Sequence, residues 1–346
     1  METIQRNSAY ELLRLVAQWF IVAYHIFLFY FVLNTDNPEP IFKAIWIPLH
    51  IGVPLFIMIS GFFRIKLSIR GIMRIIANLF IYGLIFLLIY TAIKGTHFSW
   101  KKIFFVSNTG YWFVRTYLIL YLISPIINRF ISNSTKEVRL LALCIFGYFA
   151  LWIGWNNFDQ TMHEGYDILN FIFFYLLGNT LSEYKEQLIK IPNWLVLIIW
   201  LLLNILFMIG FCQNEQYSSF IFKFTFPYNS PGITVNAVLF FTLFMRFSFQ
   251  CKTINYLASS SLAIYLIHSG SLIFRTIIKK CSLLIKEYAK NGGGQILLVF
   301  AFAAIVVFAC IAIDKLLTPI WNLTNLFADK LAATRFGKVV EQYSYR

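Results

Sequence analysis

The sequence has little charge, and most of that charge has one sign. Asp, Glu, Lys and Arg make up 13% of its 346 residues, with 29 basic side chains against 15 acidic ones. Soluble domains carry roughly 25% charged residues, which excludes a water-soluble globule of this size. In a soluble protein the net charge of +14 would indicate a nucleic-acid partner. In so apolar a chain it indicates instead how the protein is oriented in a bilayer.

Cysteine is also scarce. The cysteines are odd in number and far apart, and they form no CxxC pair: Cys144, Cys212, Cys251, Cys281 and Cys310. This pattern excludes a disulfide-stapled domain and a cysteine metal site. We expect these side chains to be apolar fillers and expect no metal cofactor.

Long apolar runs dominate what is present. Hydrophobic residues make up 59% of the chain and aromatic residues 19%. Because about 20 mostly apolar residues cross a bilayer as a helix, the runs predict about ten spans and an all-α fold, a polytopic integral membrane helical bundle. The predicted spans are residues 8–33, 43–63, 71–93, 111–130, 138–156, 166–182, 191–211, 233–249, 257–278 and 295–320.

The distribution of Lys and Arg predicts the orientation of this bundle. Segments on the side of the N-terminus hold more of these residues than segments on the other side, and cytoplasmic loops are the ones enriched in them. We therefore expect both termini to be cytoplasmic. Near the C-terminus, apolar residues recur at helical spacing among basic ones. This divides the chain into a transmembrane domain, residues 1–322, and a cytoplasmic amphipathic tail, residues 323–346.

The first predicted span carries several polar side chains. Glu11, Arg14, Gln18 and His25 lie within it, and charged groups at membrane depth are costly enough to be functional candidates. From Arg14 to His25 is about three turns of helix, a rise of roughly 16 Å. All four side chains therefore fall on one face, which must look into the bundle, and Glu11 can pair with Arg14. A buried pair that is satisfied by neighbouring helices and does no chemistry stays open as the alternative.

The second predicted span contains helix breakers. Pro48 and Pro54 are expected to bend it and to leave backbone facing a cavity. Ser60 and Gly61 follow them and would allow close approach of a ligand. Ordinary packing of small residues against another helix is the other explanation, and for Ser60 alone it is the stronger one.

A cluster of cations follows the second span. Arg70 and Arg74 are one helical turn apart at the predicted start of the third span, after Arg64 and Lys66. A helix N-terminus with guanidinium groups is typical of a phosphate site. Membrane topology explains Arg64 and Lys66 equally well.

Three later positions are also candidates. Arg115 either reaches the outer surface or lies inside the bundle, and both alternatives stay open. Tyr265 and His268 stand three residues apart in the ninth span, where a histidine is either hydrogen-bonded to a neighbour or part of a site. Asp314 in the tenth span is expected to pair with Lys315 or with a buried arginine.

In their order along the chain, these motifs resemble those of membrane acyltransferase family 3, the bacterial multi-span O-acyltransferases that modify surface carbohydrates. The matching pieces are E-L-L-R at 11–14 followed by His25, G-V-P-L-F at 52–56, S-G-F at 60–62, Arg70 with R-I at 74–75, W-F at 112–113, Y-L at 117–118, and Ser261 with Y-L at 265–266 and His268. The resemblance covers nearly the whole chain.

The resemblance implies an enzyme of the bacterial cytoplasmic (inner) membrane. It would move an acyl group, with acetyl as the expected one, from cytoplasmic acyl-CoA to a hydroxyl of an extracytoplasmic carbohydrate. It implies that His25 is catalytic, as general base or transient acyl acceptor, that Arg14 supports it, and that the basic residues after the second span bind donor phosphates. The candidate catalytic residues are therefore His25, Arg14, Glu11, Ser60 and His268, and the candidate donor-binding residues are Arg64, Arg70, Arg74, Arg115 and Tyr265.

The expected partners are acyl-CoA, a surface polysaccharide or its lipid-linked precursor, and membrane lipids, with no nucleic acid. The main rival is a transporter or exporter of a lipid-linked or polymeric glycan, and an assembly factor is a third class. We find no internal repeat, so the inverted repeats of many transporters are not indicated. For the enzyme we expect one continuous cavity between the two faces, lined by the first, second, third and ninth spans.

Overall fold

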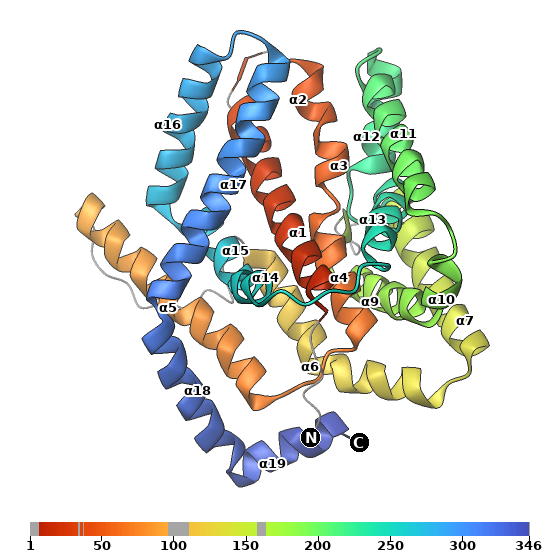
Figure 1. Cartoon of the computed structure of the whole chain (residues 1–346), viewed down its shortest axis with the longest axis vertical. Coiled ribbons are helices and arrows are strands. Elements are labelled where there is room, and N and C mark those ends of the chain that lie inside the picture. The colour runs from red at the N-terminus through yellow and green to blue at the C-terminus, as the bar shows by residue number, and fades with distance from the viewer. Residues whose placement is uncertain (1–6, 34, 37, 96–110, 158–163, 346) are drawn as a thin grey trace.

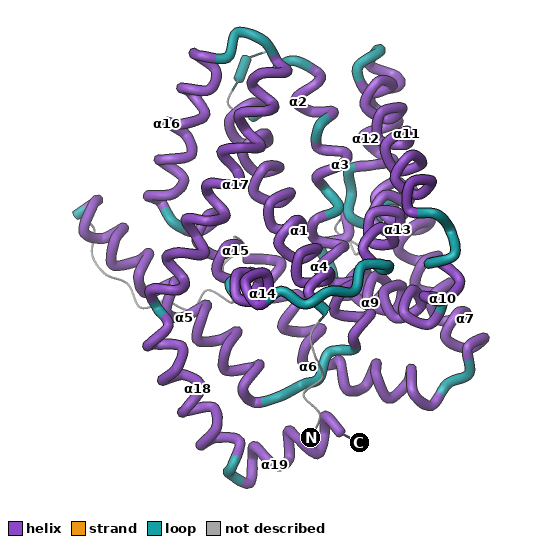
Figure 2. Tube along the Cα trace, in the orientation of Figure 1, coloured by secondary structure: helices purple, strands orange, loops and turns teal. Residues whose placement is uncertain are grey.

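The computed structural model describes residues 7–33, 35–36, 38–95, 111–157 and 164–345, and Figure 2 shows that helices dominate these ranges. The described residues form no strand, which confirms the all-α class. Within these ranges, seven helices are long and apolar enough to cross a membrane: Ser8–Val32, Pro40–Phe63, Ile69–Ile93, Trp112–Asn133, Lys136–Gly154, Asn193–Gln213 and Gly292–Leu316.

The helices follow one another from the first described residue to the last (Figure 1). Their bounds are α1 Ser8–Ile26, the π-helical segment η1 Phe27–Val32, α2 Pro40–Ala44, α3 Trp46–Leu49, α4 Gly52–Phe63, α5 Ile69–Lys94, α6 Trp112–Asn133, α7 Lys136–Gly147, η5 Tyr148–Gly154, α8 Trp155–Asn157, α9 Ile168–Glu183, α10 Lys185–Leu188, α11 Asn193–Phe211, α12 Glu215–Thr225, α13 Pro231–Phe244, α14 Lys252–Ala258, α15 Ser261–Gly270, α16 Leu272–Tyr288, α17 Gly292–Leu316, α18 Thr318–Ala332 and α19 Arg335–Tyr345.

The ninth predicted span, residues 257–278, is not one straight helix. The chain breaks between α14 and α15 and again between α15 and α16, where the two axes differ by 75°. A serine stabilises the second break, because Ser271 caps α16 by accepting a hydrogen bond from the Phe274 amide, as N-cap serines do. If this bent pair counts as one span, eight helices qualify. The predicted ranges 166–182 and 233–249 correspond to the shorter helices α9 and α13, so the count of ten stays a prediction.

The second predicted span is interrupted at its proline-rich start, as expected. Helices α2, α3 and α4 follow one another with breaks at Ile45 and at His50 and Ile51. Pro54 lies in the first turn of α4, where its missing amide hydrogen removes no intrahelical bond. Further along α4, a Cβ atom on Gly61 would come within 1.9 Å of the Tyr175 carbonyl oxygen on α9. Gly61 therefore serves close helix packing.

Helix α1 forms the centre of the bundle and contacts α4, α13, α14, α15 and α17. Figure 1 shows it surrounded by these helices. Its buried residues include Glu11 and Gln18 among apolar ones. The polar stripe predicted on the first span therefore points into the bundle, where Gln18 and His25 form hydrogen bonds with α15.

Asp314 of α17 joins several helices at one end of the bundle. Its carboxylate accepts hydrogen bonds from Tyr82 of α5 at 2.7 Å, from Ser260 beside α15 at 2.6 Å and from the Trp321 indole of α18 at 3.1 Å. The expected pairing with Lys315 is wrong, because Lys315 donates to Ser259 instead. Three neutral donors take the place of a cation here, because α5, the start of α15 and α18 all pack around the carboxylate.

The predicted tail begins inside a helix. The boundary at residue 322 falls within α18, which packs along α5 and carries Asp329 in an ion pair with Arg70 at 2.6 Å. Helix α19 then runs back toward α5 and α6. The division into two parts and the cytoplasmic placement of the termini stay predictions.

Replacing Asp314 by alanine should destabilise the protein. The change leaves the Tyr82, Ser260 and Trp321 donors without their acceptor, at roughly 1–3 kcal/mol for each donor that finds no other partner. Asp314→Asn keeps one acceptor oxygen and should cost less. Thermal unfolding in detergent measures both, and Asp329→Ala is the matched control, because an exposed ion pair contributes only about 0–1 kcal/mol. Equal melting temperatures for Asp314→Ala and Asp329→Ala would contradict the role given to Asp314.

Candidate active site

Two histidines from different helices meet near the centre of the bundle. Nδ1 of His25 on α1 lies 2.9 Å from Nε2 of His268 on α15. Nδ1 of His268 is in turn 2.6 Å from the backbone carbonyl oxygen of Ile264. The sequence places no acidic residue next to His25. Its hydrogen-bond partner is instead another histidine, which α15 contributes.

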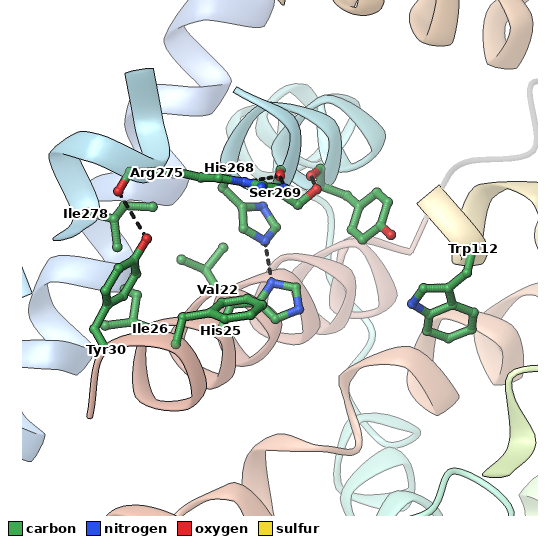
Figure 3. A pocket seen from close by; sticks show the side chains of 11 residues that line it. Val22, His25, Ile26, Tyr30, Trp112, His268, Ser269, Arg275 and Ile278 are labelled. Carbon is green, nitrogen blue, oxygen red and sulfur yellow. Dashed lines mark hydrogen bonds between the residues drawn. The ribbon is translucent and has the colours of Figure 1, made fainter. Parts of the chain in front are cut away.

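The hydrogen bonds determine which nitrogen carries each proton. A carbonyl oxygen only accepts, so Nδ1 of His268 is the donor to Ile264, and Nε2 of a neutral His268 must accept. Nδ1 of His25 then donates to it, which leaves Nε2 of a neutral His25 without a hydrogen. Figure 3 shows this nitrogen turned away from His268. The pair therefore holds His25 in the tautomer whose free lone pair can take a proton or attack a carbonyl carbon.

His25 and His268 line a cavity of about 460 Å³, which we call the histidine cavity. Figure 3 shows its walls. The remaining lining residues are Val22, Ile26, Phe29, Tyr30, Trp112, Tyr265, Ser269, Arg275 and Ile278. Arg275 is its cation: the guanidinium donates to the Ser269 carbonyl, with Nε at 2.7 Å, and the Arg275 carbonyl accepts from the Tyr30 hydroxyl.

A second cavity, of about 320 Å³, surrounds the other end of the polar stripe on α1. This arginine cavity is lined by Glu11, Arg14, Gln18, Phe56, Ser60, Gly71, Arg74, Ile75, Phe113, Val114, Tyr117, Tyr121, Ala258, Ser259, Ser261, Leu262 and Tyr265. Arg14 pairs with Glu11 at 2.5 Å, as the sequence predicts. Gln18 donates to the Ser261 carbonyl at 2.8 Å. A neighbouring cavity of about 400 Å³ shares Arg14 and Ser60 with it and adds Arg64.

One side chain, that of Tyr265, lies between the histidine cavity and the arginine cavity. Tyr265 lines both the histidine cavity and the arginine cavity. It packs edge-on against Phe113, with ring centroids 5.6 Å apart, and lies beside Tyr111. Tyr265, Phe113 and Tyr111 thus form an aromatic layer beside both cavities, and the expectation of one continuous cavity stays a prediction.

The structure brings some of the predicted donor-binding cations together and leaves others apart. Arg74 lines the arginine cavity and donates to the Ser259 carbonyl at 3.0 Å. Arg64 lines the neighbouring cavity and donates to Asn179. Arg70 is held by Asp329. Arg115 is exposed on α6, and neither it nor Arg70 lines the cavities described here.

Ser60 belongs to the arginine cavity and not to the histidine pair. Its hydroxyl donates to the Phe56 carbonyl and lies 3.0 Å from the Tyr117 hydroxyl. A role for Ser60 beside the atoms that react at His25 is therefore not supported by its position. The reason is that Ser60, near the end of α4, lies at the same depth in the bundle as Arg14.

Arg275, Tyr30 and Ser269 are residues of the histidine cavity that sequence reasoning missed. The predicted ninth span, residues 257–278, ran straight through Arg275 and so offered no reason to place it beside the histidines. The break after Gly270 turns the chain by 75° and folds Arg275 back onto the Ser269 carbonyl. Helix-breaking serines at 259–261 and at 269 and 271 were the available signal. In the described part of the chain, no three or more His, Cys, Asp and Glu side chains are grouped so as to hold a metal ion.

Comparison with known proteins agrees with the geometry at the level of the family. A family model described as an acyltransferase domain matches residues 7–315, which include α1, the arginine cavity and the histidine pair. No curated protein and no solved structure matches the chain. The matched region is nearly the whole chain, and the protein therefore belongs to acyltransferase family 3, a family of membrane acyltransferases.

Proposed function

We propose that this acyltransferase moves an acyl group, with acetyl as the expected one, from acyl-CoA to a hydroxyl of a surface or extracytoplasmic carbohydrate. The observation that supports it best is the hydrogen bond between His25 and His268 at the wall of a cavity. It prepares one nitrogen of His25 for proton transfer or nucleophilic attack. The setting would be a bacterial cytoplasmic membrane, with the arginine cavity on the cytoplasmic side.

In the direct route, His25 acts as general base. Its Nε2 takes the proton of the acceptor hydroxyl while the hydroxyl oxygen bonds to the thioester carbonyl carbon. The carbon–sulfur bond then breaks, and the leaving thiolate receives the proton from His25. His268 accepts the Nδ1 hydrogen of His25 throughout, so the imidazolium that forms is stabilised and oriented, as in other histidine-based acyl transfer.

A second route uses the same nitrogen as a nucleophile. Nε2 of His25 would first receive the acyl group as the thiolate leaves. The acceptor hydroxyl oxygen would then bond to the acyl carbon as the bond to Nε2 breaks, and the hydroxyl proton would pass to the thiolate. Incubation with radiolabelled donor and no acceptor distinguishes the routes, since only the second leaves label on the His25 peptide.

The donor would bind from the side of the arginine cavity. Arg14, Arg64 and Arg74 line it or its neighbour, and guanidinium groups bind phosphates through strong charge-assisted hydrogen bonds. The pantetheine arm of coenzyme A is narrow enough to pass the layer at Tyr265 if that ring moves aside. The thioester would then reach His25, while the acceptor occupies the histidine cavity beside Arg275.

Removing either histidine should lower the rate of the chemical step. His25→Ala deletes the base and should reduce kcat by about 10²–10⁴-fold. His268→Ala removes only the orienting partner and should lower kcat less, with little change in the KM for donor. Thiol release from acetyl-CoA by protein purified in detergent measures both, and the melting temperature checks folding. A His25→Ala protein that folds and transfers acetyl at the wild-type rate would remove His25 from the mechanism.

Arg74 and Arg70 should differ in their effect on donor binding. Arg74→Ala should raise the KM for acetyl-CoA roughly tenfold or more, since a hydrogen bond to a charged group contributes about 1.5–3 kcal/mol. Arg70→Ala is the matched comparison, one turn away and paired with Asp329, and its KM should rise less. Steady-state kinetics on both variants decide the point. A fall in kcat alone for Arg74→Ala, with donor affinity intact, would argue against a phosphate site there.

The size of the side chain at position 265 should control the rate of acetyl transfer from acetyl-CoA. Tyr265→Trp enlarges the aromatic layer and should lower kcat/KM for acetyl-CoA about tenfold, whereas Tyr265→Phe preserves the ring and should lose less. The reason is that the donor must cross this layer to reach His25. Comparing acetyl-CoA turnover of the two purified variants gives the test, and a tryptophan variant as active as the phenylalanine one would exclude a donor path past this residue.

A further inference from the structure

A third, smaller cavity is also lined by His25. We call it the aromatic chamber; its volume is about 100 Å³, and it shares His25, Trp112 and Tyr265 with the histidine cavity. Aliphatic side chains of α1, α3 and α4, among them Val53, complete its wall. Its lining is mostly aromatic, with two histidines, four tyrosines and Trp112, and among its described lining residues there is no arginine, in contrast to the histidine cavity.

The chamber has a firmly packed wall. His50 stacks on Tyr24 with ring centroids 4.7 Å apart and contacts the Tyr228 ring at 4.3 Å. Trp112 packs edge-on against Tyr166 at 4.4 Å. Rings that interlock in this way change position only together, so the chamber has a defined size.

Backbone contacts also hold together the segments that carry the Tyr166 and Tyr228 rings. The Tyr228 amide donates to the Glu164 carbonyl at 2.9 Å. Between Glu164 and Tyr166, Gly165 has a φ of +85°, and a Cβ there would lie 2.6 Å from the Asn229 amide nitrogen. Only glycine fits this left-handed position next to another backbone. The segments that carry Tyr166 and Tyr228 are therefore held in close register.

We infer that the aromatic chamber receives the acyl group of the donor and that Val53 helps to set the longest chain transferred. This inference rests on the proposed function. A thioester carbonyl beside Nε2 of His25 has two cavities to extend into. The larger one, of about 460 Å³, carries Arg275 and suits a polar acceptor, whereas the smaller one, of about 100 Å³, has room only for a short chain.

The volume predicts which chains fit. At about 100 Å³, the chamber has less than a quarter of the volume of the histidine cavity, about 460 Å³. An acetyl group has three heavy atoms, and a butyryl group has five. We therefore expect acetyl to be transferred readily and butyryl to be strongly disfavoured.

Opposite changes of one side chain test the inference. Val53→Ala enlarges the chamber and should raise the butyryl-to-acetyl ratio of kcat/KM about tenfold or more, the usual effect of a methylene in an apolar pocket. Val53→Ile fills it and should lower the propionyl-to-acetyl ratio. The measurement is thiol release from acetyl-, propionyl- and butyryl-CoA. Val306→Ala is the matched control: Val306 on α17 is similarly buried, lines none of the cavities described here, and should leave both ratios unchanged.

The outcomes separate this inference from the proposed function. Wild-type protein that transfers acetyl, with Val53 variants whose ratios stay at the wild-type value, would overturn the acyl role of the chamber and leave the enzyme assignment intact. Wild-type protein that uses no acyl-CoA at all would overturn both. If Val53→Ala does not fold, the isoleucine variant still decides, because a general loss of packing does not change the preference for chain length.

Discussion

Polar groups inside an apolar bundle must find partners within the protein, because hydrocarbon offers them none. The arrangement around α15 follows from this constraint. The break before α15 frees the Ser259 carbonyl, which Arg74 satisfies, and the break after it frees the Ser269 carbonyl, which Arg275 satisfies. Each helix break thereby brings a guanidinium group to the edge of a cavity. One short helix carries Tyr265 and His268 between these two cations.

This arrangement divides the interior by depth. Arg14 and Arg74 line the arginine cavity, the histidine pair and Arg275 line the histidine cavity, and the Tyr265 ring lines both. Donor recognition and chemistry would then be coupled through the movement of a single ring, which is a smaller rearrangement than the motion of a whole helix.

The sequence predicted the components of the site better than their connections. The stripe from Glu11 to Gln18 and the Glu11–Arg14 pair follow from helical periodicity alone, since residues three, four and seven apart share a face. His268 was recognisable as a histidine near mid-span. The break that isolates α15 was not recognised, because a run of apolar residues with serines looks the same whether it is straight or bent. The absence of Arg275 from the predicted site and the wrong partner for Asp314 share this origin.

The sequence by itself determined the fold class, the inward face of α1 and the membership of the family, because hydrophobic periodicity and ordered motifs are local properties of the chain. Only the tertiary structure decided which polar groups meet. His25 and His268 are 243 positions apart, and no periodicity relates them. The aromatic chamber is assembled from α1, α3, α4, α6, α15 and two loops, so its volume depends on how these elements pack. A cavity is what side chains leave unfilled, and that is fixed by packing among distant segments and not by any one of them.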